Sequence, residues 1–521
     1  MKYIFGFVSL FLICFNTTAQ NIPNLVSIYN TDSTLRGTGV LKNGLMEGLW
    51  RFENPKTSRL IQTIQFEGGR REGLLVIFYP NGNKNTEAEF RNNELTGIFK
   101  QYDESGALTV ERVFRDSIPV GPYREYFGRT APAAEILLVN PKQVKLEGQY
   151  VDGKKDGKWV SYYASGEPAK VETFKNGIQE GPAIEFFLDG SILSEVLYKE
   201  GKPDGPYVRY SLPKMVEEKG NFKNGKKVGN WESYFPSSRI IESETFFDDN
   251  GNRTGEWKFY YMSKRIARTE KYENDLAIGT WEEFYPNRNL AKRKTYELGV
   301  PVGDYTEYHQ NGKISVKGQY KSGAKDGLWI SYFPEGKVYS IGEYKNDVKT
   351  GLWKYFNKIG ILIAEGEYTL GSENGQWFYY YDGGQLKSIG SYFLGFEEGT
   401  WGLFYDNKQL TQEEYWSNGR LMNVSDYNSY DGSKKLDKGT LKDGQGTRIT
   451  YYTSGSVESI GNYKSGKADG NWTYFHDNGK KASEGQMKEG KKEGSWRYFN
   501  IAGRLEQIIQ YKDDEVVESN N

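Results

Sequence analysis

The sequence predicts an all-β fold: an elongated, solenoid-like antiparallel meander of about nineteen stacked β-hairpin repeats, each 24 residues long. Three observations predict it. A glycine followed two residues later by a large aromatic residue recurs every 24 residues, Asn-Gly pairs separate short aromatic or β-branched runs, and no window sustains a helical apolar stripe. The composition agrees, because 61 glycines and 15% aromatic residues accompany only 37% hydrophobic residues. An ordinary layered core needs more apolar residues than that.

The recurring glycine serves as the anchor of each unit. Eighteen anchors run from Gly48 to Gly494, and a degenerate nineteenth unit is anchored at Asn423. Because one unit buries too little surface to fold alone, aromatic residues at one register position predict a core shared between neighbouring units. Eleven of the twelve tryptophans stand two residues after an anchor: Trp50, Trp159, Trp231, Trp257, Trp281, Trp329, Trp353, Trp377, Trp401, Trp472 and Trp496.

Each unit is expected to contain two strands and two turns. In the unit that starts at Gly327, residues 328–333 and 337–344 are the expected strands, separated by Pro-Glu-Gly. Asn-Gly pairs predict tight hairpin turns in which both residues have positive φ. Such pairs occupy first turns (Asn81-Gly82, Asn311-Gly312 and Asn478-Gly479) and second turns (Asn43-Gly44, Asn176-Gly177 and Asn224-Gly225).

The chain divides into four predicted segments. Residues 1–19 predict a secretory signal peptide, because Lys2 precedes an apolar run that ends at the small residues Thr17-Thr18-Ala19. Residues 20–47 predict an N-terminal half-repeat or cap, residues 48–511 the repeat array, and residues 512–521 a polar tail, either disordered or guarding the sheet edge. We therefore expect an exported chain, periplasmic, on the outer surface or secreted, that loses its single cysteine, Cys14, on maturation.

Two places break the period. An insert at residues 128–143 predicts a longer loop or a spare strand, with a partner contact as the alternative. The degenerate unit near residues 423–445 is expected to be a loosely packed hinge. Units that carry another residue at the tryptophan position are expected to be looser as well, and these residues are Leu75, Ala183, Ser425 and Arg448.

Composition and motifs argue against several functions. Lysine and arginine (68) balance aspartate and glutamate (69), so no global charge favours nucleic acid. After the signal sequence, no stretch approaches the roughly 20 apolar residues of a transmembrane helix. The two histidines, His309 and His476, precede first turns and are interpreted as solvent-exposed turn residues. We therefore expect no catalytic residues, no metal site and no cofactor, and the protein is not expected to be an enzyme.

The unit resembles the MORN (membrane occupation and recognition nexus) repeat, and in particular the longer bacterial variant found in proteins named YwqK-like antitoxins. In one unit the resemblance is carried by Gly157, Trp159, Tyr162, Tyr163, Gly166, Phe174, Asn176 and Gly177. It covers residues 48–511. The resemblance implies stacked β-hairpins in an elongated sheet and a role as a scaffold, partner-binding or dimerising module.

A second aromatic position lies five residues after the anchor, on the opposite face of the strand from the tryptophans. Its tyrosines form either a packing ladder or an exposed binding stripe, and the binding candidates are Tyr162, Tyr234, Tyr260, Tyr308, Tyr332 and Tyr380. The favoured function is a non-catalytic exported scaffold that binds an unknown protein or envelope component along its sheet. The alternatives are a module that binds cell-envelope polysaccharide and an antitoxin-like neutraliser of a partner protein.

Overall fold

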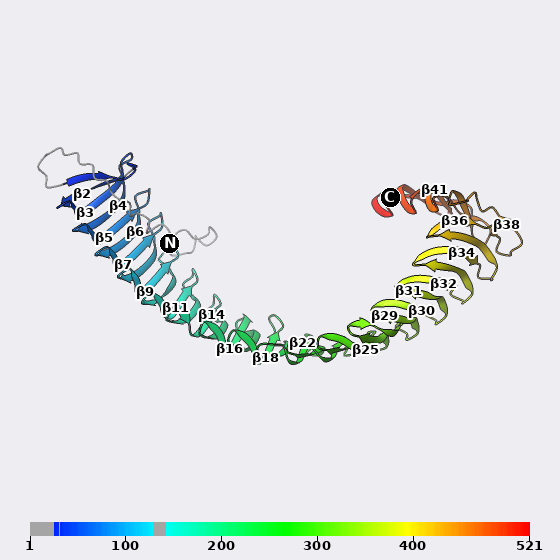
Figure 1. The fold of residues 1–521 in the computed structure, drawn as a ribbon, viewed down its shortest axis with the longest axis horizontal. Coiled ribbons are helices and arrows are strands. Elements are labelled where there is room, and N and C mark those ends of the chain that lie inside the picture. The colour runs from blue at the N-terminus through cyan, green and yellow to red at the C-terminus, as the bar shows by residue number, and fades with distance from the viewer. Residues whose placement is uncertain (1–24, 31, 129–141, 521) are drawn as a thin grey trace. The chain divides into compact units, whose positions relative to one another are not determined.

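The computed structural model describes residues 25–30, 32–128 and 142–520. The predicted signal peptide at 1–19 and most of the insert at 128–143 lie outside the described residues. Those described form forty-five β-strands and no helix. Most strands pair antiparallel with the next or the next-but-one strand in the sequence, so the prediction of an all-β meander is confirmed (Figure 1).

The chain separates into two compact units, residues 1–264 and 265–521. The strands of the first unit are β1 (Leu25–Tyr29), β2 (Arg36–Lys42), β3 (Leu45–Asn54), β4 (Arg59–Glu67), β5 (Arg70–Phe78), β6 (Lys84–Arg91), β7 (Glu94–Tyr102), β8 (Leu108–Arg115), β9 (Ile118–Tyr126), β10 (Val144–Val151), β11 (Lys154–Tyr162), β12 (Pro168–Lys175), β13 (Ile178–Gln179), β14 (Gly181–Phe186), β15 (Ile192–Lys199), β16 (Lys202–Leu212), β17 (Met215–Lys223), β18 (Lys226–Tyr234), β19 (Ile241–Phe247) and β20 (Gly255–Tyr260).

The second unit continues the same pattern and ends in two smaller sheets, β37–β38 and β39–β45. Its strands are β21 (Ile266–Glu273), β22 (Leu276–Ala277), β23 (Gly279–Phe284), β24 (Leu290–Glu297), β25 (Val300–Tyr308), β26 (Ile314–Lys321), β27 (Ala324–Lys325), β28 (Gly327–Tyr332), β29 (Val338–Lys345), β30 (Val348–Phe356), β31 (Leu362–Thr369), β32 (Ser372–Tyr380), β33 (Leu386–Phe393), β34 (Phe396–Phe404), β35 (Leu410–Ser417), β36 (Arg420–Val424), β37 (Tyr427–Asn428), β38 (Lys435–Leu436), β39 (Gly446–Tyr451), β40 (Val457–Lys464), β41 (Lys467–Phe475), β42 (Lys481–Lys488), β43 (Lys491–Phe499), β44 (Leu505–Lys512) and β45 (Glu515–Asn520).

The anchor glycines lie within or at the start of strands, not in the hairpin turns. All eighteen have positive φ, as Gly157 does at 70°. The pairing register shifts beside them, for example between Glu147 and Gln149 on the strand opposite Gly157. A glycine with positive φ is typical of one class of β-bulge, and a bulge bends a strand and increases its twist. The 24-residue glycine period is therefore a period of bulges.

The two kinds of turn differ. At Asn176-Gly177 both residues have positive φ, 52° and 83°, as predicted for a tight hairpin. At the first turn only Gly82 has positive φ, while Asn81 does not. The amide of Gly82 donates to the carbonyl of Tyr79 and the amide of Tyr79 to the carbonyl of Asn83. First turns are thus three-residue loops closed by a glycine bulge, which corrects the prediction of two-residue turns there.

The core contains a row of tryptophans, nine of which lie over a glycine on the preceding strand. A Cβ added to Gly366 would lie 2.1 Å from the ring of Trp377, so only glycine fits beneath the indole. The Trp377 Nε1 donates to the carbonyl of Glu367 at 3.1 Å. Tyrosines fill the space between successive indoles, with the Tyr355 and Tyr379 rings nearly parallel to that of Trp377. Each unit therefore completes the core of the next.

The degenerate unit has a buried cluster of its own, and its expected role as a hinge stays a prediction. The regular ladder stops there, but Leu421, Val424 and Leu441 form a buried cluster. Arg448 occupies a tryptophan position, and its guanidinium pairs with the carboxylate of Glu414, both side chains being at most 14% exposed. A buried ion pair thus replaces the indole. In another unit expected to be loose, Ala183 is also buried.

The expectation of a disordered C-terminal tail is wrong. Residues 515–520 form β45, which pairs antiparallel with β44 from Lys512 opposite Glu515 onward. β44 presents a free row of backbone groups, and this segment pairs with it as an edge strand through its own backbone.

Candidate functional site

The six predicted tyrosines are all half-buried, being neither an open row nor a closed core. They lie on the face opposite the tryptophans. Tyr162 donates its hydroxyl hydrogen to Glu147 at 2.7 Å and Tyr380 to Glu365 at 2.9 Å, in each case across to the preceding strand. Tyr234 and Tyr260 likewise donate to a glutamate, Glu232 and Glu244 respectively, the second at 2.5 Å. Tyr308 and Tyr332 accept hydrogen bonds from the preceding unit through their backbone carbonyls.

These contacts change the acidity of the phenols. Burial and the hydrogen bond to a carboxylate raise the pKa of Tyr162, Tyr260 and Tyr380 to about 12. Their hydroxyl groups are therefore committed within the sheet, and a ligand on this face would meet ring edges and glutamates. The proposed binding stripe of tyrosines stays a prediction.

A second ladder joins consecutive units through the residue six positions after the anchor. The hydroxyl of Tyr285 donates to the carbonyl of Tyr308 at 2.7 Å, and the hydroxyl of Tyr381 donates to the carbonyl of Phe404 at 2.8 Å. His309 occupies the same position, with Nε2 2.9 Å from the carbonyl oxygen of Tyr332. The other residues at this position that make the contact are Tyr79, Tyr163, Tyr405, Tyr452 and His476. Tyr427, four residues after Asn423 in the degenerate unit, makes a similar bond to the carbonyl of Tyr451.

The interpretation of the two histidines as solvent-exposed is therefore wrong. Both are half-buried and both hold the next unit through a ring nitrogen. Imidazole replaces phenol here because either group places one donor at the same distance from the backbone. Within the described residues, no group of three or more histidine, cysteine, aspartate or glutamate side chains is arranged to hold a metal ion.

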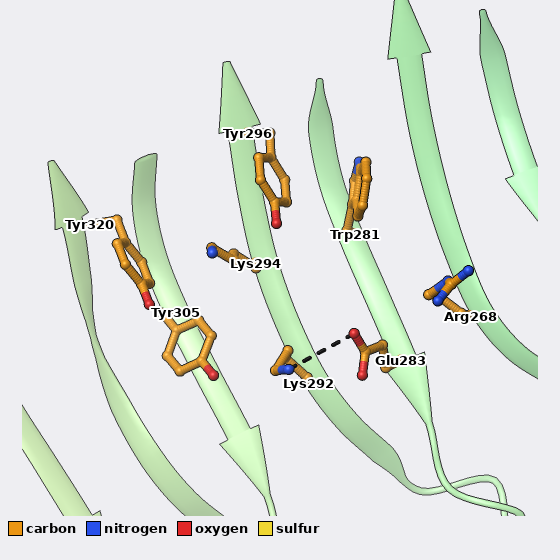
Figure 2. A pocket seen from close by; sticks show the side chains of 8 residues that line it. All are labelled: Arg268, Trp281, Glu283, Lys292, Lys294, Tyr296, Tyr305 and Tyr320. Atoms are coloured by element: carbon orange, nitrogen blue, oxygen red, sulfur yellow. Dashed lines mark ion pairs between the residues drawn. The ribbon is translucent and has the colours of Figure 1, made fainter. Parts of the chain in front are cut away.

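The described part of the second unit contains a hollow of about 260 Å³ between β21 and β26. Figure 2 shows Lys292, Lys294 and Tyr296 along β24, with Trp281 and Glu283 beside them on β23. Alternate residues of a strand share a face, which brings these side chains together. The lining is completed by Arg268, Tyr305 and Tyr320.

Sequence reasoning missed this hollow, although the repeat contains its signal. Nine of the eleven core tryptophans have a glycine eleven residues earlier, and all nine are buried. The two exceptions are Trp257, preceded by Phe246, and Trp281, preceded by Glu270, and both indoles are only half-buried. A side chain at the glycine position keeps the ring from lying flat on the backbone. The hollow opens beside the second of these rings, that of Trp281.

Comparison with known proteins identifies the repeat. The sequence profile of the MORN repeat variant matches residues 71–92, 155–176, 301–322, 325–346, 373–393, 445–465 and 468–489. Each matched segment begins one or two residues before an anchor glycine, so the matches share the register of the structure. The match identifies the repeat and not the antitoxin subclass.

No curated protein matches the chain. Solved structures that align with it include the crystal structure of TcdB2-TccC3-Cdc42, at 10% identity over 94% of this chain and 30% of that one, and that of TcdB2-TccC3, at 11% identity over 95% and 32%. The TM-score is 0.12 in both cases, and the chain spans about a third of the length of these proteins. No helix able to cross a bilayer occurs among residues 25–30, 32–128 and 142–520. The chain is thus a repeat protein containing seven segments of the MORN repeat variant.

Proposed function

We propose that this chain is a non-catalytic, exported scaffold that binds a partner protein along the turn edge of its sheet. MORN repeats generally serve as protein-binding or membrane-binding modules and are a non-enzymatic repeat type. The contacts described above support the same role, since the histidines and the recurrent tyrosines are used to join one hairpin to the next.

The observation that carries the proposal is a row of exposed apolar side chains on consecutive second turns of the second unit. Leu370 is 82% exposed, Phe393 63% and Phe396 53%, and Val348 and Leu394 are also exposed. These residues belong to the hairpins β29–β30, β31–β32 and β33–β34, whose turns follow one another along one edge. Contiguous exposed apolar surface of this kind marks interaction sites in proteins that remain in solution.

The proposal is tested by recovery of partners from cell-envelope extract with chain lacking residues 1–19. Replacement of Leu370, Phe393 and Phe396 by serine should abolish recovery of the partner protein and leave the melting temperature within a few degrees. Ile359 is a matched control, because it is equally exposed but lies in the first turn between β30 and β31, at the other end of the same strands. Equal recovery by the triple variant and by Ile359→Ser would refute the assignment of the second-turn edge.

A further inference from the structure

The hollow between β21 and β26 combines aromatic walls with an excess of positive charge. Its lining contains four aromatic rings, three cationic side chains and one carboxylate, that of Glu283. Lys292 lies 3.9 Å from Glu283 and 3.9 Å from Glu307, and Arg268 lies 2.7 Å from Glu270. Two of the three cations therefore have a carboxylate within reach.

Lys294 is the third cation, and it makes no hydrogen bond or ion pair with any of the described residues. Its Nζ lies 4.6 Å from the ring centre of Tyr320 and 5.2 Å from that of Tyr296, so it lies over aromatic faces (Figure 2). Burial and the neighbouring charge of Lys292 lower the pKa of Lys294. The carboxylate of Asp347 acts on Lys294 in the opposite direction but forms no ion pair with it. An ammonium group in a recess that makes no direct ion pair has most to gain from an anionic ligand.

Two departures from the repeat leave the adjacent indole accessible. Glu270 stands where nine other units have the glycine that receives the indole face. Ala277 stands where five other units have a lysine four residues before the tryptophan, and those lysines lie over the indole, as Lys349 does at 4.3 Å from Trp353. Trp281 thus lacks both the glycine beneath the indole, which all nine buried equivalents have, and the lysine over it, which five of them have.

We propose that this hollow binds one carboxylate-bearing sugar ring, of the hexuronic acid class, within an acidic polysaccharide. The ring would lie against the aromatic wall formed by Trp281, Tyr296 and Tyr320, and its carboxylate would pair with the Lys294 ammonium. Glu283 would accept hydrogen bonds from the sugar hydroxyls. An acidic peptide could not make these bonds, because an ionised glutamate side chain has no hydrogen to donate. A volume of about 260 Å³ suits a single ring rather than an extended chain segment.

The test uses the full chain without residues 1–19 and measures binding by calorimetry and by quenching of tryptophan fluorescence. The probes are trigalacturonate, the neutral trisaccharide galactotriose and a hexaglutamate peptide. Trigalacturonate should bind about tenfold more tightly than galactotriose, and Lys294→Gln should remove that difference. Lys294→Arg keeps the charge and should preserve the preference. Lys317→Gln is the matched control, because Lys317 lies over the ring of Tyr332, 5.8 Å from its centre, and outside the hollow.

Three results would overturn the proposal. Equal affinity for the acidic and the neutral trisaccharide would show that Lys294 does not recognise a carboxylate. An equal loss with Lys317→Gln would show only a general charge effect. Binding of hexaglutamate that equals or exceeds that of trigalacturonate and depends on Lys294 would assign the hollow to an acidic protein segment instead. Because the probes are free ligands, none of these results bears on the second-turn edge.

Discussion

Replacing Gly366 by alanine tests the central packing rule of this fold. The added Cβ would lie 2.1 Å from Cδ2 of Trp377, whose indole is 2% exposed and is held by a hydrogen bond to the carbonyl of Glu367. The backbone of Gly366 does not require positive φ, so alanine is excluded by the indole alone. Overpacking a core costs about 1–3 kcal/mol and loss of a hydrogen bond about 1 kcal/mol. We therefore expect a loss of about 2–4 kcal/mol in local stability.

Hydrogen exchange measured by mass spectrometry would locate the effect. Protection should fall in β30 to β34 and stay unchanged in distant strands, since each unit contacts only its neighbours. Gly402→Ala is the control, because its added Cβ would meet Phe404 at 3.2 Å, where a small movement relieves the contact. In a Trp377→Leu background, Gly366→Ala should cost far less, because the clashing ring is gone. An undiminished cost in that background, or loss of protection from end to end, would refute the reasoning.

Three further predictions follow from the ladders and the sequence. His309→Phe should lower the free energy of unfolding by about 1 kcal/mol, whereas His309→Tyr should restore it, as thermal denaturation would show. The raised pKa of Tyr162, Tyr260 and Tyr380 means that the folded state holds these phenol protons more tightly than the unfolded chain does. Their contribution to stability is therefore complete below pH 10 and disappears between about pH 10 and 12. Absorbance of the phenolate at alkaline pH should show this late titration, and titration of all tyrosines near pH 10 would contradict it. Export should remove the chain up to Ala19, which N-terminal sequencing of the secreted protein would detect as a new terminus.

The sequence was sufficient for the fold because its strongest signals are local and repeated. Trp377 and its equivalents mark the buried face, and pairs such as Asn176-Gly177 strongly favour a tight hairpin turn in which both residues have positive φ. Chain connectivity then leaves little choice, since short turns place consecutive strands side by side. The first turns were mispredicted because an Asn-Gly pair fits both a two-residue turn and the last two positions of a three-residue loop.

The wrong predictions share one physical cause. The role of a side chain depends on its neighbours in space, and the spacing of residues in the sequence does not identify those neighbours. Arg448 looked like the loss of a core residue, yet the carboxylate of Glu414 makes it a buried one. The histidines looked exposed because they adjoin turns, yet the next unit supplies a carbonyl to each. The polar tail looked unstructured because its pairing comes from the backbone of β44 and not from its own side chains.

The same dependence explains why the departures from the repeat are more informative than the repeat itself. A position that is glycine beneath nine buried indoles is fixed by packing, so it carries no information about ligands. At Glu270 that constraint is absent, the indole of Trp281 is left half-buried, and the repeat loses some of the burial that stabilises each unit. Lys294 adds a second cost, because its ammonium group lies among aromatic rings and makes no ion pair with the described residues. Two unfavourable substitutions, one that lines the hollow and one beneath the indole that borders it, are expected where binding, rather than stability, determines the residues.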